Sequence, residues 1–165
     1  MTTASGGGFE LPPLALYVHI PWCVKKCPYC DFNSHTAGPN LPEEDYVDAL
    51  LADLDADLAQ VHNRPLSSIF FGGGTPSLFS AKALGRLLEG VERRVAFTPD
   101  IEITLEANPG TFEQAKFRDY RSLGINRLSI GVQSFQPPKL IALGRIHDGD
   151  EAVRAADMAR AAGFD

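Results

Sequence analysis

The chain has 165 residues, 44% of them hydrophobic, which is enough for a core of ordinary single-domain size. Its formal net charge is −6, and its Lys and Arg residues are scattered, so the basic stripe typical of nucleic-acid-binding proteins is missing. No apolar run approaches the roughly 20 residues of a membrane helix, and the first residues do not resemble a secretion signal. We therefore expect a cytoplasmic protein with no transmembrane segment and no nucleic-acid partner.

Residues 1–13 are small, polar and rich in glycine and proline, a composition that predicts a flexible leader. From Leu14 to Ile20 the chain is almost continuously apolar. Such a run is typical of a strand that is buried on both faces of a parallel sheet. The folded domain is therefore expected to cover residues 14–165.

A helix is predicted after the turn-rich residues 36–40. Pro42 suits its first turn, and Glu43, Glu44 and Asp45 would meet the positive end of the helix dipole. Its apolar positions recur at helical spacing: Val47, Leu50, Leu51, Leu54, Leu58 and Val61. The acidic residues between them are interpreted as a solvated face rather than a metal site: Asp48, Asp53, Asp55 and Asp57.

Three further strands are predicted at residues 67–71, 101–106 and 128–132. The helix that follows the first of them is expected to be capped by Ser80 and to bury Leu84, Leu87, Leu88 and Val91. Thr111 with Gln114 predicts a capping box for a helix that ends at Gly124. Asp148 with Glu151 predicts the same device for a helix over residues 149–162, with Gly163 as its stop.

Strand and helix thus alternate four times, which predicts an α/β fold with a parallel sheet, right-handed crossovers and helices outside. Four units are too few to close an eight-strand barrel, so we expect a partial parallel (β/α) barrel that stops before closure. The chain ends where a fifth strand should begin, which suggests an incomplete domain whose fourth strand has an unpaired edge. Ligands bind beyond the carboxyl ends of such strands. The cysteine loop, the glycine run at residues 72–74 and the segment Glu106–Pro109 should therefore share one rim.

All three cysteines lie in the loop after the first strand: Cys23, Cys27 and Cys30. Three thiolates can bind iron or zinc, and they leave one position of a four-coordinate metal open. Zinc with His19 or His35 as a fourth ligand is the weaker alternative, because structural zinc sites usually contain two cysteine pairs or a pair with histidines. The odd count disfavours disulfides, and polar neighbours disfavour buried thiols. An iron–sulfur site is favoured.

The stretch from Tyr17 through Cys30 resembles the cluster loop of radical S-adenosylmethionine (SAM) enzymes. Residues 30–35, Cys-Asp-Phe-Asn-Ser-His, resemble those of the HemW-type haem chaperones, relatives of the oxygen-independent coproporphyrinogen III oxidases. The resemblance extends over about residues 15–165. It implies a radical SAM core in which Cys23, Cys27 and Cys30 bind a 4Fe–4S cluster. The fourth iron of that cluster would bind the amino and carboxylate groups of SAM.

The same resemblance implies a set of cofactor-binding residues. The glycine run lacks the spacing of a dinucleotide or phosphate loop and, taken alone, fits a plain tight turn. In the resemblance its backbone meets the methionyl amino group of SAM. Glu106 could accept hydrogen bonds from a ribose or an ammonium group, and the fork of Arg145 suits a carboxylate. The full set is Tyr17, Tyr29, Gly73, Gly74, Thr75, Glu106, Gln133 and Arg145.

The favoured function is a haem chaperone that binds haem or porphyrin and passes haem to haem-dependent proteins. The alternative is an oxygen-independent coproporphyrinogen III oxidase. In the resemblance, the oxidases have a fourth cysteine two residues beyond the last cluster ligand, where this chain has Phe32. Its absence favours the chaperone. A different radical SAM enzyme and a zinc scaffold are weaker alternatives.

Haem is a further candidate ligand, and four histidines could bind it or a metal: His19, His35, His62 and His147. Each is interpreted as a hydrogen-bonded scaffold or surface residue, with His19 the best functional candidate because it lies beside the cluster loop. No catalytic residue is assigned.

Overall fold

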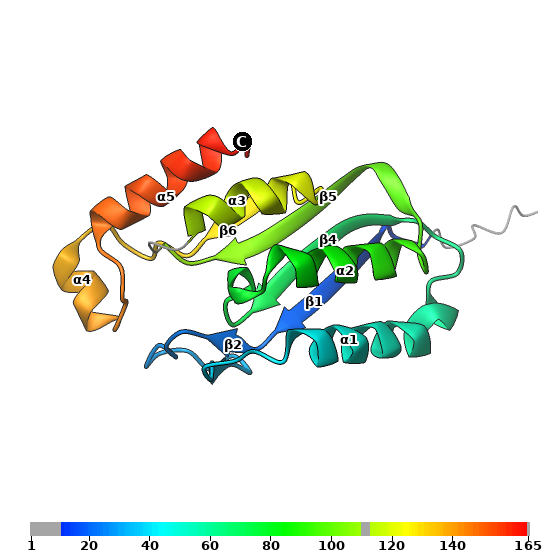
Figure 1. Cartoon of the computed structure of the whole chain (residues 1–165), viewed down its shortest axis with the longest axis horizontal. Helices are drawn as coiled ribbons and strands as arrows, with labels where there is room; N and C mark the ends of the chain where they lie inside the picture. The colour runs from blue at the N-terminus through cyan, green and yellow to red at the C-terminus, as the bar shows by residue number, and fades with distance from the viewer. Residues whose placement is uncertain (1–10, 110–112, 165) are drawn as a thin grey trace, which may run out of the picture.

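The computed structural model describes residues 11–109 and 113–164. Its centre is a parallel four-stranded sheet in the order β1-β4-β5-β6 (Figure 1). The strands are β1 (Leu14–Ile20), β4 (Leu66–Gly73), β5 (Phe97–Ala107) and β6 (Arg127–Ile130). Consecutive strands of this sheet are neighbours and all pairs are parallel. The predicted α/β class, with an open parallel sheet built from four strand–helix units, is confirmed.

Helices lie on one face of the sheet. Figure 1 shows α1 (Glu43–Asp57), α2 (Ala81–Glu92) and α3 (Glu113–Ser122) side by side in front of the strands. Right-handed crossovers place successive helices on the same side, which explains this arrangement. The other helices are α4 (Pro137–Ala142) and α5 (Gly149–Ala161), which packs against α3. No helix within the described ranges is both long and apolar enough to cross a membrane.

The first strand differs from its prediction in one respect. Val18 and Ile20 are buried under the helices, whereas Ala15 and Tyr17 are exposed. The expectation that β1 is buried on both faces was therefore wrong for the described chain, since α1–α3 cover only one of them. β1 and β6 end the sheet, so the predicted unpaired edge of the fourth strand is present.

The core lies between the helices and the covered face of the sheet. Leu84, Leu87, Leu88 and Val91 of α2 are buried as their spacing predicted. They pack in one cluster with apolar residues of the strands, including Ile20, Ile69, Phe71 and Leu105. The pattern of apolar residues therefore identified the buried side of α2 correctly.

The predicted helix ends are largely confirmed. Ser80 caps α2 by accepting a hydrogen bond from the N–H of Ala83. Asp148 and Glu151 form a complete capping box at α5. Gly124 and Gly163 have φ angles of +96° and +88°, the left-handed conformation that ends a helix. The predicted Thr111 capping box involves a residue outside the described ranges.

Several elements were not predicted or have different bounds. The short strands β2 (Trp22–Cys23) and β3 (His35–Thr36) form a separate two-stranded sheet. Both strands are too short to show any periodicity in the sequence. The helix α4 was also not predicted, because the two prolines at its start suggest a turn. The 3₁₀ helices η1 (Leu58–Gln60) and η2 (Pro76–Leu78) follow α1 and β4, so α1 ends earlier than its apolar pattern predicted. Of the predicted leader, residues 1–10 lie outside the described part, and the Pro12 carbonyl accepts a hydrogen bond from Arg64.

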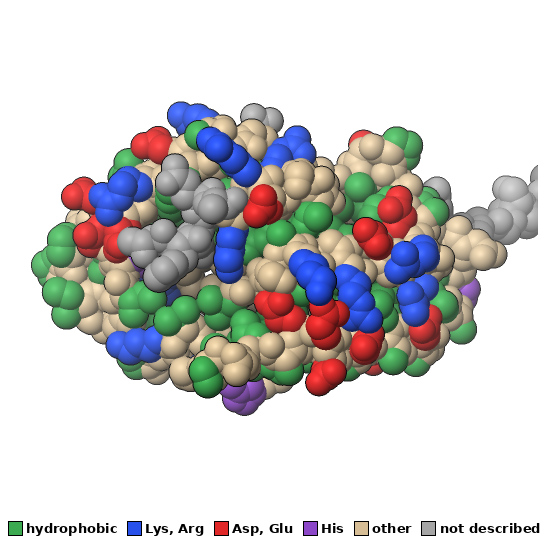
Figure 2. All heavy atoms as spheres, viewed as in Figure 1, with side chains coloured by type: hydrophobic (Ala, Val, Ile, Leu, Met, Phe, Trp, Pro, Cys, Tyr) green, Lys and Arg blue, Asp and Glu red, His purple; other side chains and the backbone are tan. Residues whose placement is uncertain are grey.

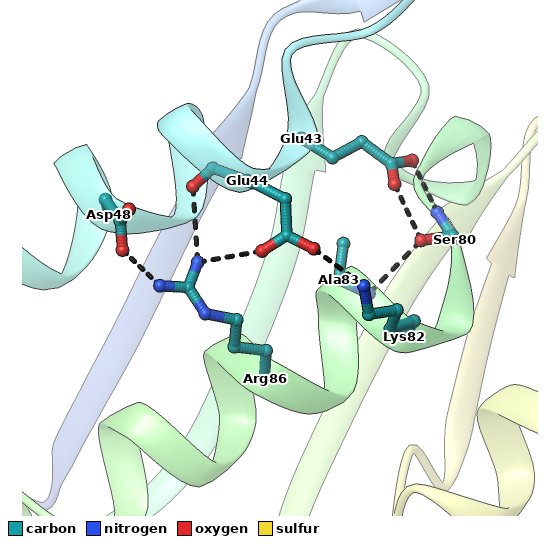
Figure 3. A network of polar contacts seen from close by, with 7 residues as sticks. All are labelled: Glu43, Glu44, Asp48, Ser80, Lys82, Ala83 and Arg86. Atoms are coloured by element: carbon teal, nitrogen blue, oxygen red, sulfur yellow. Dashed lines mark hydrogen bonds and ion pairs between the residues drawn. The ribbon is translucent and has the colours of Figure 1, made fainter.

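Polar contacts join the outer surfaces of α1 and α2 (Figure 3). Glu44 pairs with Lys82 and with Arg86, which also contacts Asp48. Farther along α1, Asp55 binds Arg94 through two hydrogen bonds of 2.6 and 2.9 Å, which lower the pKa of the Asp55 carboxyl. The interpretation of Asp48 and Asp55 as part of a merely solvated face was therefore incomplete.

Glu43 makes a different contact in the same network. Its carboxylate accepts the backbone N–H of Ser80 at 2.7 Å and the Ser80 hydroxyl at 2.6 Å, as Figure 3 shows. The Ser80 hydroxyl in turn accepts the N–H of Ala83. The first turn of α1 thus completes the cap of α2, a role beyond the dipole interaction expected from the sequence.

We expect Glu43→Ala to lower the free energy of unfolding by about 1–2 kcal/mol, because the half-buried Ser80 N–H loses its acceptor. Glu44→Ala is the matched control, since it also removes one carboxylate from the first turn of α1. Its ion pairs are exposed, so its cost should stay below about 1 kcal/mol. Equal costs in urea unfolding would contradict the capping role of Glu43.

Candidate functional site

The carboxyl ends of the four strands meet at one edge of the sheet, because all of its strand pairs are parallel. A cavity of about 490 Å³ lies there, beside the cysteine loop. Every predicted site residue except Tyr17 lines it: Cys23, Cys27, Cys30, Tyr29, Gly73, Gly74, Thr75, Glu106, Gln133 and Arg145. The expectation that the cysteine loop, the glycine run and the Glu106 segment share one rim is confirmed.

The base of the cysteine loop is closed by the pairing of β2 with β3. The N–H of His35 donates to Pro21, and the N–H of Ala37 donates to Cys23, both at 2.7 Å. The ring of Trp22 packs against Phe79 and, edge-on, against Tyr46. The loop is therefore anchored to the core at its root, while the residues between the cysteines remain mostly exposed.

Two side chains brace the far part of the loop. The Lys26 ammonium donates to the carbonyl oxygens of Phe32 and Ser34 at 3.2 and 3.1 Å. His19 Nε2 lies 2.8 Å from the carbonyl oxygen of Asn33, so this nitrogen carries the proton. His19 Nδ1 then accepts the Tyr17 hydroxyl at 3.1 Å. Both ring nitrogens of His19 are thus engaged, which supports a scaffold role over that of a zinc ligand.

The three thiols are partly buried on the wall of the cavity. Cys27 Sγ accepts a hydrogen bond from Arg145 Nη1 at 3.4 Å, and Cys30 Sγ lies 3.9 Å from the Ser34 hydroxyl. No three His, Cys, Asp or Glu side chains within the described ranges lie close enough to bind a single metal ion. Thiolates are the ligands of iron–sulfur clusters, so three of them around one cavity fit a group of several irons.

The glycine run at the end of β4 packs directly against the chain that leaves β1. The N–H of Gly74 donates to Ile20 at 2.8 Å, and the N–H of Thr75 donates to Trp22 at 2.7 Å. A Cβ atom on Gly74 would lie 2.6 Å from the Trp22 carbonyl oxygen. Gly73 has a φ angle of +112°, which favours glycine. The run is therefore more than a plain turn, because it also fixes the base of the cysteine loop.

Glu106 lies beside the glycine run and Tyr17. Burial raises the pKa of the Glu106 carboxyl, and a hydrogen bond from the N–H of Gly73 partly opposes that rise. Burial also raises the pKa of Tyr17, with a smaller contribution from the charge of Glu106. Tyr17 is thus connected to the site through Glu106 and His19, although it is not one of the described residues that line the cavity.

Gln133 reaches the cavity from a distorted loop after β6. Its φ angle of +64° is uncommon for a residue other than glycine, and such strain concentrates at functional sites. The N–H of Val132 bonds to the carbonyl of Ile130 and that of Ser134 bonds to the carbonyl of Val132, so one tight turn precedes Gln133 and Gln133 is the central residue of a second. His147 Nε2 donates to the Val132 carbonyl at 3.0 Å. His147 is 5% exposed, and burial, chiefly, lowers its pKa.

Arg145 and Asn108 join the loops of the rim. Arg145 Nη2 donates to Asn108 Oδ1 and to the Gly131 carbonyl, both at 2.7 Å. Asn108 Nδ2 donates to the Thr75 hydroxyl at 2.9 Å. Sequence reasoning assigned Arg145 but missed Asn108, although its place after β5, two residues beyond Glu106, was a usable signal. Much of the Arg145 fork is already used within the chain.

Comparisons with known proteins agree with this geometry. The family model described as the Radical SAM superfamily matches residues 17–165. The protein named "Heme chaperone HemW" of Escherichia coli (strain K12) is 57% identical over 155 residues, covering 94% of this chain and 41% of that protein. Its namesake in Haemophilus influenzae is 54% identical over 159 residues, covering 94% of this chain and 42% of that one.

Among solved structures, the coproporphyrinogen III oxidase HemN of Escherichia coli, described as a radical SAM enzyme, matches with a TM-score of 0.83 and 32% identity. The match covers 92% of this chain and 35% of that one. The chain therefore spans about two fifths of the length of its curated relatives.

Gly74→Ala should destabilise the fold by about 1–3 kcal/mol, because its Cβ would collide with the backbone of Trp22. Gly38→Ala is the control: a Cβ there meets nothing within 4 Å and should leave stability nearly unchanged or slightly raised. Thermal unfolding of both variants tests this expectation. A Gly74→Ala variant as stable as the Gly38→Ala variant would contradict the packing described here.

His147 should make stability depend on pH. As the pH falls below about 6.5, the unfolded chain takes up a proton at His147 that the folded chain resists, so the free energy of unfolding decreases. His147→Gln can keep the donor to Val132 without titrating, so its decrease should be smaller. Urea unfolding between about pH 7.5 and 5.5 measures the slope. His62→Gln, at an exposed position, controls for the loss of one histidine; equal slopes in both variants would refute the prediction.

Proposed function

Because the chain belongs to the radical SAM superfamily, we propose that Cys23, Cys27 and Cys30 bind a 4Fe–4S cluster and that the adjoining cavity binds S-adenosylmethionine. The observation that carries this proposal is the convergence of these thiols with the glycine run, Glu106, Gln133 and Arg145 on one cavity of about 490 Å³. Ligand pockets span roughly 300–1,000 Å³, so the cavity has a suitable size.

The donor set suits the proposed ligands. Bound at three thiolates, the cluster supplies an iron with an open coordination position and an electron for cleavage of the sulfonium. Glu106, with its burial and its bond from Gly73, is placed to accept hydrogen bonds from hydroxyl or ammonium groups. The N–H groups of Gly73, Gly74 and Thr75 are already bonded within the chain. An ammonium group only donates hydrogen bonds, so contacts from this run to an ammonium would use its carbonyl oxygens, which are acceptors.

The remaining cofactor residues approach from the other loops. Gln133 presents an amide with both donor and acceptor groups. Tyr29 is half exposed on the cysteine loop, and burial followed by the charge of Cys27 raises its pKa, so its hydroxyl stays protonated. We assign it to packing beside the adenine, a contact that an aromatic face can make. Tyr17 contributes indirectly, because its hydroxyl donates a hydrogen bond to His19 and its ring lies near Glu106.

For the whole protein we propose a haem chaperone that binds haem and passes it to haem-dependent proteins in the cytoplasm. Support comes from the high identity to proteins named for this function over nearly the whole of this chain. The second candidate is an oxygen-independent coproporphyrinogen III oxidase, favoured by the structural likeness to HemN. Phe32 stands where the oxidases are expected to have a further cysteine, which favours the chaperone.

Cys27→Ala should abolish the brown chromophore after anaerobic reconstitution, because a cubane cluster would lose one of three protein ligands. Iron and sulfide analysis with the absorption spectrum measures this. Val24→Ala is the control, since Val24 is an exposed residue of the same loop that cannot bind iron. Wild-type protein that takes up zinc but no iron–sulfur cluster would overturn the proposal, as would full cluster content in Cys27→Ala.

Two experiments on reconstituted protein test the finer assignments. SAM should change the electron paramagnetic resonance (EPR) spectrum of the reduced cluster, and Glu106→Gln should require more SAM for the same change. Titration with haem followed by absorption, and incubation of the reduced protein with SAM and coproporphyrinogen followed by mass spectrometry of the product, separate the two candidates. Haem binding without loss of carboxyl groups from coproporphyrinogen supports the chaperone, whereas decarboxylation supports the oxidase.

A further inference from the structure

We propose that Asn108 is a positioning residue that holds Arg145 against Cys27, and that Arg145 thereby raises the reduction potential of the cluster bound there. This inference rests on the proposed cluster at Cys23, Cys27 and Cys30. It adds a function for Arg145 that does not involve SAM, and it assigns a function to Asn108, which none of the preceding assignments uses.

Arg145 is the residue through which the rim contacts a cluster thiol. Its Nη1 lies 3.4 Å from Cys27 Sγ, while its Nη2 bonds at 2.7 Å to both Asn108 Oδ1 and the Gly131 carbonyl. Because the guanidinium is planar, the two short bonds at Nη2 fix the direction of the N–H groups at Nη1. The contact with sulfur is therefore set by groups on the opposite side of the fork.

Asn108 is itself fixed by a hydrogen bond and by close packing. Its Nδ2 donates at 2.9 Å to the hydroxyl of Thr75, which is 3% exposed. A Cβ on Gly131 would lie 2.9 Å from Asn108 Oδ1, so the chain after β6 approaches this amide closely. Asn108 thus connects the loops after β4, β5 and β6 at the point where Arg145 binds.

The loop that carries Arg145 also touches the cysteine loop directly. Gly144 has a φ angle of +67°, and a Cβ there would lie 2.9 Å from the Pro28 ring. The segment between α4 and α5 therefore packs on the tip of the cysteine loop next to Cys27. This contact places the backbone of Arg145 beside the cysteine loop, and Asn108 fixes the guanidinium group at the end of the side chain.

The electrostatic consequence follows from the charge of the guanidinium. Arginine stays protonated in proteins, and hydrogen bonds to cluster sulfurs are among the factors that set reduction potentials. Reduction adds one negative charge to the cluster and its thiolates. A fixed cation with an N–H aimed at Cys27 stabilises the reduced form more than the oxidised form, so its removal should make the cluster harder to reduce.

The test is a potentiometric titration of the reconstituted chain, followed by EPR and carried out without SAM so that any contact of Arg145 with SAM is absent. Arg145→Met should lower the reduction equilibrium constant about tenfold, which is about 59 mV for a one-electron couple. Arg145→Lys should fall between this variant and wild type, because it keeps the charge but not the fork. Asn108→Ala should shift the potential in the same direction by less.

Non-additivity tests the positioning role. If Asn108 acts through Arg145, the double variant should have the potential of Arg145→Met alone. Asn126→Ala is the matched control. This asparagine, just before β6, also makes two side-chain hydrogen bonds of 2.8 Å, to the backbone of Ile101 and Ile103 in β5. It should leave the potential unchanged, whereas an equal shift would indicate a general effect of loosening the sheet.

The outcomes separate this inference from the proposed function. Wild-type protein that takes up no cluster overturns both. Normal iron content with an unchanged potential in Arg145→Met and Asn108→Ala overturns the inference and leaves the proposed function standing. Additive shifts overturn the role of Asn108. If Arg145→Met takes up no cluster, the potentials of Arg145→Lys and Asn108→Ala decide the question by the same criterion.

Discussion

The site depends on one backbone contact, between the chain that leaves β1 and the glycine run that ends β4. Two hydrogen bonds, from Gly74 to Ile20 and from Thr75 to Trp22, continue the pairing of these strands beyond their ends. Gly74 has no room for a side chain because the Trp22 carbonyl occupies that space. The cysteine loop therefore leaves the sheet in a fixed direction, and its thiols come to lie over the rim where the other strands end.

Around this contact, charges of both signs are placed at different positions of one cavity. Glu106 lies near Tyr17 and the glycine run, whereas Arg145 lies against Cys27. Neither group is free to move far, since each is bonded to the backbone or to another loop. A prearranged acceptor and a prearranged cation are suited to a ligand with ammonium, hydroxyl and carboxylate groups, and they need little reorganisation when it binds.

The outer helices contribute to stability without entering the site. Glu43 of α1 completes the cap of α2 through Ser80, and the ion pairs of this face lie on the helices rather than at the rim. In Figure 2, red side chains gather along α1 and blue side chains lie beside them along the neighbouring α2. Residues that support the fold and residues that line the cavity are thus separated, so substitutions on α1 and α2 should affect the two properties differently.

The sequence alone determined the order of the four main strands and their crossover helices, the buried side of α2, the capping residues Ser80 and Asp148, and the rim shared by the cysteine loop, the glycine run and the Glu106 segment. These features follow from local chemistry: apolar periodicity, helix caps and the meeting of parallel strand ends. Tertiary structure alone decided the pairing of β2 with β3, the strained conformation of Gln133 and the bonds of Asn108 to Arg145. The physical reason is that such contacts join loops distant in sequence. The residue spacing within one loop does not determine which neighbouring loop will supply its hydrogen-bond partners.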